Sequence, residues 1–334
     1  MVQTMEQILS KTKFSDPSSD KKPLIISGPC SAETEEQVLA TALALQKTGK
    51  VDVLRAGIWK PRTRPGSFEG IGTKGLAWLQ KAREITGLPL AVEVATAKQV
   101  EDALHFGVDI LWVGARTTVN PFSVQEVADA LKGVDTTVLI KNPINPDLEL
   151  WIGAVERIQK AGINKVGLIH RGFSSYGNTQ YRNAPMWHLA IELKRRMPEL
   201  PMICDPSHIS GRRDILQEVS QEAIDLDYDG LMLETHVDPD NAWSDAKQQV
   251  TPEKLAELLD GIVWRREHTD KKDFNSALEK LRAQINQVDD EIMLLLGNRM
   301  KIAEKIGMYK KENNITILQT NRWNEILDRN IAKG

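Results

Sequence analysis

The sequence predicts an α/β protein, a (β/α)8 TIM barrel followed by a C-terminal all-α domain. Over roughly the first 240 residues, short apolar runs alternate with helical patterns, and eight such units are typical of this barrel. A doubly wound open sheet is the alternative, but no Gly-rich dinucleotide fingerprint follows the first run. Beyond this region the apolar residues take the spacing of one long helix, which indicates a separate helical domain.

Each predicted strand is an apolar run that ends in a charged or conformationally special residue. The predicted strand runs are 24–30, 53–60, 88–94, 110–115, 137–142, 165–172, 201–208 and 230–236. Helical patterns lie between and after them, at 35–48, 75–86, 97–106, 124–132, 148–161, 187–197 and 252–263. We therefore expect residues 1–263 to form the barrel, with reactive groups gathered at the C-terminal ends of its strands.

The C-terminal part begins with the charged segment 264–273, WRREHTDKKD, which has no apolar period and is expected to be a linker. Between 278 and 309, steps of three and four separate the apolar residues, with Arg299 at one of the same positions. This heptad pattern predicts a helix that pairs with another helix. Arg299 is either a register-setting polar residue or a buried cation for an anionic ligand. Lys310 lies on the same face, ~20° away, whereas Arg282 would come from a second copy in a dimer.

Composition excludes several classes of protein. Hydrophobic residues are 41% and charged residues 27% of the 334, ordinary values for a globular protein. No apolar run reaches the ~18 residues that span a bilayer, and a net charge of −3 is too weak for a nucleic-acid footprint. The polar N-terminus has no signal core, and two cysteines are too few for a disulfide framework. We expect a cytoplasmic protein that binds neither membranes nor nucleic acids.

Four potential metal ligands fall at the predicted mouth of the barrel. Cys30, His208, Glu234 and Asp245 offer sulfur, nitrogen and oxygen donors. This mixture suits a divalent transition ion such as Mn²⁺, Fe²⁺, Co²⁺ or Zn²⁺ better than Ca²⁺ or Mg²⁺. Each residue taken alone is more often structural, since a lone cysteine usually serves as a small core residue. The prediction depends on all four types falling at one end of the barrel.

Six cations lie in or after four of the same predicted strands: Arg55, Lys60, Arg62, Arg116, Lys141 and Arg171. They would repel one another without an anion, and the carboxylates of Glu93 and Asp205 are too few to pair with all of them. We therefore expect a substrate that carries phosphate and carboxylate groups, which arginine binds through paired hydrogen bonds. Surrounding cations should lower the pKa of Lys60 and make it a proton donor. A fixed phosphate-binding ammonium or a Schiff-base lysine are the alternatives.

The motifs that carry these residues resemble those of a known family. They are IISGPCSAE at 25–33, LRAGIWKPRT at 54–63, VGAR at 113–116, LIKN at 139–142, HRG at 170–172, DPSH at 205–208 and LMLETH at 231–236. Together they resemble the 3-deoxy-D-arabino-heptulosonate-7-phosphate (DAHP) synthases of the short-barrel branch, which condense phosphoenolpyruvate with erythrose 4-phosphate in the shikimate pathway. The sister 3-deoxy-D-manno-octulosonate-8-phosphate synthases are the lesser alternative, and KPRT favours the DAHP side.

The resemblance implies a role for each of these residues. The implied metal ligands are Cys30, His208, Glu234 and Asp245, with Mn²⁺ as the first choice. The implied phosphoenolpyruvate-binding residues are Arg55, Lys60, Ala115 through its backbone N–H, Arg116, Lys141 and Arg171. The implied erythrose 4-phosphate-binding residues are Arg62, Thr63 and Asp205. Lys60, Cys30 and His208 are the implied catalytic residues.

The helical domain, 274–334, resembles the all-helical chorismate mutases. LRAQINQVDDEIMLLLGNRMKIAEKIGMYK and ILQTNRW match their first helix and the start of their second. The implied chorismate- or prephenate-binding residues are Arg282, Arg299, Lys310 and Arg322. We expect the third helix of that family to be absent, since the sequence ends at Gly334. The domain is expected to convert chorismate to prephenate, to form a homodimer or larger oligomer and to regulate the barrel; alternatively, it only dimerises the chain and senses prephenate.

Overall fold

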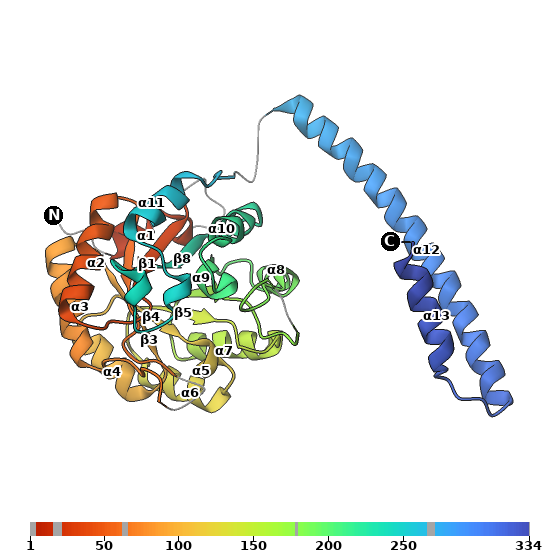
Figure 1. Ribbon diagram of the computed structural model, residues 1–334, viewed down its shortest axis with the longest axis horizontal. Helices are drawn as coiled ribbons and strands as arrows, with labels where there is room; N and C mark the ends of the chain where they lie inside the picture. Colours follow the sequence, from red (N-terminus) through yellow and green to blue (C-terminus); the bar gives the residue numbers. More distant parts are fainter. Residues whose placement is uncertain (1–4, 16–21, 62–65, 178–179, 266–270, 334) are drawn as a thin grey trace. The chain divides into compact units, whose positions relative to one another are not determined.

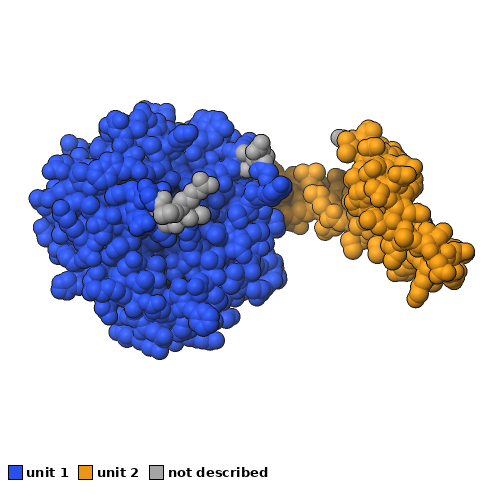
Figure 2. Space-filling view, turned by 60° about the horizontal axis from the view of Figure 1, so that its bottom comes forward, with its two compact units in different colours: residues 1–266 blue, residues 267–334 orange. Residues whose placement is uncertain are grey.

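The computed structural model describes residues 5–15, 22–61, 66–177, 180–265 and 271–333. The chain divides into two compact units, Met1–Arg266 and Glu267–Gly334 (Figure 2). We call them the barrel unit and the helical unit. Each is described by itself below.

The barrel unit is a closed ring of parallel strands, each paired with its neighbours in the sequence (Figure 1). The strands are β1 Leu24–Gly28, β2 Val53–Arg55, β3 Leu90–Val94, β4 Ile110–Val113, β5 Thr137–Lys141, β6 Lys165–His170, β7 Met202–Cys204 and β8 Gly230–Glu234. Pairing of Leu24 with Gly230 closes the ring. The predicted TIM barrel is thereby confirmed.

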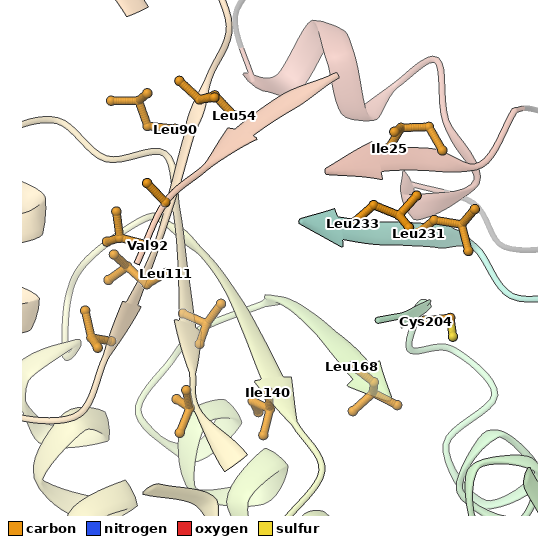
Figure 3. Packing of buried hydrophobic residues seen from close by; sticks show 14 of the residues in the cluster. Ile25, Leu54, Leu90, Val92, Leu111, Ile140, Leu168, Cys204, Leu231 and Leu233 are labelled. Atoms are coloured by element: carbon orange, nitrogen blue, oxygen red, sulfur yellow. The ribbon is translucent and has the colours of Figure 1, made fainter. Parts of the chain in front are cut away.

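Side chains on the strands divide into two hydrophobic clusters, as expected for alternation along a strand. One cluster contains strand residues such as Ile26, Val53 and Trp112, and it fills the barrel. Ile8 and Phe14, from the N-terminal segment, belong to the same cluster. The other cluster lies between strands and helices and includes Leu54, Leu90, Val92, Leu111 and Ile140 (Figure 3). The strands are thus buried on both faces.

Helices follow the strands and form the outer layer (Figure 1). They are α2 Glu35–Thr48, α3 Lys74–Thr86, α4 Ala97–His105, α6 Pro121–Ala130, α7 Leu148–Lys160, α8 Trp187–Arg196, α10 Leu216–Asp225 and α11 Pro252–Asp260. Shorter helical elements are α1 Met5–Leu9, η1 Lys13–Ser15, α5 Ala115–Thr118, α9 Pro206–Ser210, η2 Pro239–Asn241 and η3 Ala246–Gln248. Sequence analysis did not single out α10, although Leu216, Val219 and Ala223 recur on one buried face.

Strand β2 ends at Arg55, earlier than the predicted run 53–60. The chain leaves the sheet there because Gly57 bonds to the loop after β1: its N–H donates to Cys30 O (3.2 Å), and its carbonyl accepts from Ala32 N (2.9 Å). A Cβ at Gly57 would lie 2.3 Å from Cys30 O, so only glycine allows this approach. Lys60 is thereby placed in a loop next to the end of β1.

Over residues 271–333, the helical unit contains two helices, α12 Lys272–Glu312 and α13 Thr320–Ile331. Neither has a buried residue within the described part of the unit. Apolar side chains of the heptad pattern are therefore open to solvent, among them Leu281, Ile285, Val288 and Ile292. Across the residues that the structure describes, no helix is both long enough and apolar enough to cross a membrane.

Candidate active site

Three predicted metal ligands meet at the C-terminal end of the barrel. Cys30 follows β1, Glu234 ends β8, and Asp245 lies in the loop after β8. One ligand atom from each lies within 4.8 Å of the others, and Cys30 Sγ is 3.1 Å from Asp245 Oδ2. The fourth, His208 on α9, places Nε2 3.7 Å from Glu234 Oε1. Segments far apart in the sequence thus bring all four donors to one region.

Local structure holds two of these ligands in place. Asp205 caps the N-terminus of α9: its carboxylate accepts from His208 N–H (3.2 Å) and contacts His208 Nδ1 (2.9 Å). This contact leaves the other ring nitrogen, Nε2, on the Glu234 side. Asp245 has a left-handed backbone, with φ of 49°. Such a conformation in a residue other than glycine costs about 1–2 kcal/mol and is common at functional sites.

The donor set fits a divalent transition ion. Burial, together with the nearby Glu234 carboxylate, raises the pKa of the Cys30 thiol to about 12. The thiol therefore stays protonated unless a cation replaces the proton, as a coordinated metal ion does. Sulfur, imidazole nitrogen and carboxylate oxygen around one point are the ligands that Mn²⁺, Fe²⁺, Co²⁺ and Zn²⁺ accept. The described residues thus form a possible metal site, which does not by itself distinguish among these ions.

Several of the predicted anion-binding cations lie beside this cluster. Arg55 is 2% exposed and forms an ion pair with Glu234 (3.0 Å). Lys141 forms one with Asp205 (2.7 Å), and its Nζ lies 5.5 Å from the centre of the Trp112 ring. The Arg55 guanidinium contacts the same ring at 5.0 Å. Trp112 on β4 therefore contacts two cations, one from β2 and one from β5, at one end of the barrel.

Arg171, directly after β6, completes the described buried cations of this region. Burial, along with the nearby guanidinium groups of Arg182 and Arg116, lowers its pKa to about 10. Arg116 is exposed on α5, and Ala115 is the first residue of the same helix. Crowded positive charges of this kind favour binding of an anion. Arg62 and Thr63, predicted to bind a second phosphate, lie outside the described residues.

The expectation that neighbouring cations lower the pKa of Lys60 is wrong. Burial does lower it, but the nearby Cys30 and Glu234 raise it more, so the net pKa lies above its usual value. Lys60 Nζ lies 2.7 Å from Cys30 Sγ and 3.1 Å from Cys30 O. The sequence showed the cations around Lys60 but not the three acidic groups that the fold places beside it. Lys60 is therefore an ammonium group at neutral pH in the metal-free site.

Sequence analysis missed four polar residues that contact the predicted ligands. Gln248 donates to Glu234 Oε2 (2.6 Å), and Gln249 accepts from Cys30 N–H (2.9 Å). Arg182 forms an ion pair with Asp245 (2.9 Å), and Asn183 accepts from Arg171 (2.7 Å). Arg182, Asn183 and Gln249 lie in loops and Gln248 ends the short helix η3, so none belongs to a periodic pattern. The only signal was their position shortly after a predicted strand or ligand.

In the helical unit, three predicted ligand-binding cations make local contacts. Arg282 pairs with Glu279 (2.8 Å), Arg322 pairs with Glu325 (2.7 Å), and Lys310 donates to Ile317 O (2.8 Å). Arg299 lies on α12 with Arg282 and Lys310. The two ion pairs join residues three apart and are typical of an exposed helix, whereas Lys310 contacts a carbonyl in the segment between α12 and α13. The assignment of these four residues to a binding site stays a prediction.

Comparisons with known proteins give two family matches. The model of the DAHP synthetase I family matches residues 13–270. The model of chorismate mutase type II matches residues 281–334.

Individual relatives resemble the barrel unit. Phospho-2-dehydro-3-deoxyheptonate aldolase of Thermotoga maritima is 34% identical over 235 residues, which are 70% of this chain and 67% of the relative. The 2-dehydro-3-deoxyphosphooctonate aldolase of Desulfotalea psychrophila is 31% identical, covering 72% of this chain and 88% of the relative. The crystal structure of the Thermotoga maritima DAHP synthase has a TM-score of 0.64 at 32% identity and covers 71% of this chain. The match spans 66% of that solved chain, about two thirds of its length.

Proposed function

Because the chain belongs to the DAHP synthetase I family and carries a chorismate mutase type II domain after the barrel in the sequence, we propose that its barrel condenses phosphoenolpyruvate with erythrose 4-phosphate. The products are DAHP and inorganic phosphate. One observation carries the proposal: Cys30, Glu234, Asp245 and His208 converge beside Arg55 and other buried cations. An ion that polarises a carbonyl and cations that hold a phosphorylated carboxylate are both needed for this reaction.

A divalent ion held by Cys30, His208, Glu234 and Asp245 would supply Lewis acidity toward the aldehyde oxygen of erythrose 4-phosphate. The chain's own residues bind and orient the other substrate. Arg116, Lys141 and Arg171, with the Ala115 N–H, hold the phosphate and carboxylate of phosphoenolpyruvate. Arg55 and Lys60 border its reacting carbons. With these charges held still, the enol carbon faces the aldehyde carbon, and the proximity lowers the barrier to C–C bond formation.

The remaining steps are assigned to groups near the phosphoenolpyruvate C2. Water adds to C2 as the new C–C bond leaves positive charge there, and the C–O bond to phosphate then breaks. The Lys60 ammonium is charged at neutral pH in the metal-free site and can donate a proton to the aldehyde oxygen of erythrose 4-phosphate as this oxygen becomes a hydroxyl group. The alternative role of Lys60 is a fixed electrostatic contact to phosphate. Asp205, Arg62 and Thr63 are assigned to the second substrate.

Turnover assays test this proposal. Purified chain, incubated with Mn²⁺, phosphoenolpyruvate and erythrose 4-phosphate, should release inorganic phosphate and form DAHP, and a chelator should abolish both. The 2-dehydro-3-deoxyphosphooctonate aldolases among the relatives favour a second candidate, condensation with arabinose 5-phosphate. Turnover of arabinose 5-phosphate in place of erythrose 4-phosphate would decide for that candidate. Full activity after exhaustive chelation would refute the role of the metal ion.

For the helical unit we propose chorismate mutase activity together with regulation of the barrel by prephenate. The exposed apolar residues of α12 support the further proposal that two copies pair through this unit. Arg282, Arg299, Lys310 and Arg322 would then bind the carboxylates of chorismate or prephenate, and the linker 264–273 separates the two domains. The alternative is that the unit dimerises the chain and senses prephenate without catalysis. A direct chorismate assay, and synthase rates with and without prephenate in whole and tail-deleted chains, distinguish them.

A further inference from the structure

The loop between β6 and α8 is held at both ends by hydrogen bonds. Near its start, Phe173 N–H donates to Ala184 O (2.8 Å). Near its end, His170 Nε2 contacts Pro185 O (2.7 Å), and Tyr228 Oη contacts His170 Nδ1 (2.8 Å). A carbonyl can only accept, so Nε2 carries the proton and Tyr228 donates to Nδ1. Residues 180–186 of the loop are therefore fixed to the barrel wall.

The same loop packs closely against α9, the short helix that carries His208. Arg182 N–H donates to Ser210 O (3.2 Å), and Asn183 N–H donates to Ile209 O (3.1 Å). Gly211 follows α9 with φ of 66°, and a Cβ there would lie 2.4 Å from the Arg182 Cβ. The backbone approach thus needs glycine at 211. This close approach fixes the backbone positions from which the side chains of residues 182 and 183 extend.

Arg182 reaches two groups around the candidate metal site. Its Nη1 donates to Asp245 Oδ1 (2.9 Å) and to Gln248 Oε1 (2.5 Å). The Gln248 Nε2 in turn donates to Glu234 Oε2 (2.6 Å). The Asp245 Oδ2 is the oxygen that contacts Cys30 Sγ. Arg182 therefore occupies one Asp245 oxygen and leaves the other facing the ligand cluster, while Gln248 occupies one oxygen of Glu234.

Asn183 connects the candidate anion site to α9. Its Oδ1 accepts from Arg171 Nη1 (2.7 Å), and its Nδ2 donates to His208 O (2.6 Å). Both partners fix the same amide orientation, since a guanidinium only donates and a carbonyl only accepts. Asp at this position would retain the first contact and turn the second into a repulsion between two oxygens. Asn183 thus sets the direction of the Arg171 guanidinium.

We propose that Arg182 and Asn183 are a pair of positioning residues with separable roles. Arg182 orients the Asp245 and Glu234 carboxylates toward a divalent ion. Asn183 orients Arg171 toward the anionic groups of phosphoenolpyruvate. The proposal rests on the proposed function for the identity of both ligands. Neither residue touches the reacting atoms, so both act through the residues that they hold.

The expected effects differ between the two residues. Loss of a group that orients a metal ligand typically weakens metal binding by about 10–100-fold. Arg182→Met, which keeps the length of the side chain but not its charge, should therefore raise the Mn²⁺ Kd by about 10-fold or more. Arg182→Lys retains the charge and should recover part of this loss. Asn183→Ala should raise the phosphoenolpyruvate Kd of the Mn²⁺-loaded chain by about 10-fold, which corresponds to about 1.4 kcal/mol. Its Mn²⁺ Kd should stay within threefold.

Isothermal titration calorimetry on the full chain measures both constants without turnover. Mn²⁺ is titrated into chelator-treated protein, and phosphoenolpyruvate into protein saturated with Mn²⁺. The matched control is Arg212→Met, because Arg212 also pairs with a carboxylate, Asp214 (2.5 Å), but within the described part of the barrel unit forms no ion pair with a predicted metal ligand. The control should leave both constants unchanged. The melting temperatures should remain close to that of the wild-type chain, since Arg182 is exposed and Asn183 half-buried.

Three results would overturn the pair assignment. One is an Arg182→Met chain whose Mn²⁺ Kd stays within twofold of wild type. Another is an Asn183→Ala chain that weakens both ligands equally as its melting temperature falls, because this indicates a merely structural loop. The third is a wild-type chain that binds no Mn²⁺, which would also remove the metal site. If the wild-type chain binds both ligands but forms no DAHP, the proposed function fails, and the two Kd comparisons still decide the positioning roles.

Discussion

Replacing Lys141 with methionine tests whether the buried ion pair with Asp205 is needed for stability. The two side chains are 5% and 0% exposed, and their charged atoms lie 2.7 Å apart. Removing one partner of such a pair costs about 3–5 kcal/mol because the other charge stays buried. Asp205 retains its contacts with the N–H and the ring of His208, so the lower end, about 3 kcal/mol, is expected. For a barrel of this size that lowers the melting temperature by about 6–12 °C.

The assay is scanning calorimetry of the barrel transition with a chelator present, on Lys141→Met, Asp205→Asn and the double variant. Asp205→Asn removes the charge and keeps an oxygen that can accept from His208 N–H. The double variant leaves no unpaired charge, so it should be more stable than the sum of the two single losses predicts. Two results would contradict the assignment of a buried, energetically coupled pair. One is additive losses of stability in the double variant, and the other is a melting temperature of Lys141→Met within about 2 °C of wild type.

Three further predictions follow from individual residues. Cys30→Ala should lose Mn²⁺ binding and synthase turnover, whereas Cys204→Ala, at the other buried cysteine, should retain both in equilibrium dialysis and phosphate-release assays. Burial raises the pKa of Asp229 from 3.8 to about 6, so its contribution to stability is present below pH 4 and lost as the pH rises through 6. In urea denaturation, the free energy of unfolding of the wild type should fall between pH 4 and pH 8 by about 3 kcal/mol more than that of Asp229→Asn. The same pH dependence of the unfolding free energy in both chains would rule this out. Gly211→Ala should displace Arg182 and weaken Mn²⁺ binding about as much as Arg182→Met does, and an unchanged Kd would argue against the close approach.

The barrel could be predicted from sequence because burial on both faces leaves its strands as continuous apolar runs. Runs 110–115 and 137–142, for example, contain β4 and β5 in full. The packing of the N-terminal segment against the interior of the barrel gave no such signal. Ile8 and Phe14 join the interior cluster, but they are isolated apolar residues in a polar segment. Their role depends on where the segment packs, which local periodicity does not determine.

The candidate site was predictable in its residue types but not in its pairings. Strand ends that converge in a barrel place Cys30, His208 and Glu234 in one region, whatever the loops do. The ion pair between Arg55 and Glu234 and the chain from Arg182 through Gln248 to Glu234 depend on loop conformation. That conformation is set by contacts between distant segments, such as the loop after β6 against α9. For the same reason, the raised pKa of Lys60 could not be inferred from neighbours in the sequence alone.

The charges around Cys30 connect the two parts of the candidate site, the predicted metal ligands and the predicted anion-binding cations. With the thiol protonated, the Glu234 and Asp245 carboxylates balance the cations of Arg55 and Lys60, the four charged groups that most strongly shift the pKa of Cys30. Binding of a divalent ion adds two positive charges and releases the thiol proton, so this group changes from neutral to a net charge of +1. A positive centre beside Arg171 and Lys141 attracts an anion more strongly than the metal-free site does. Charge balance therefore predicts that the metal ion and the phosphorylated carboxylate each tighten binding of the other by the same factor, as linkage requires.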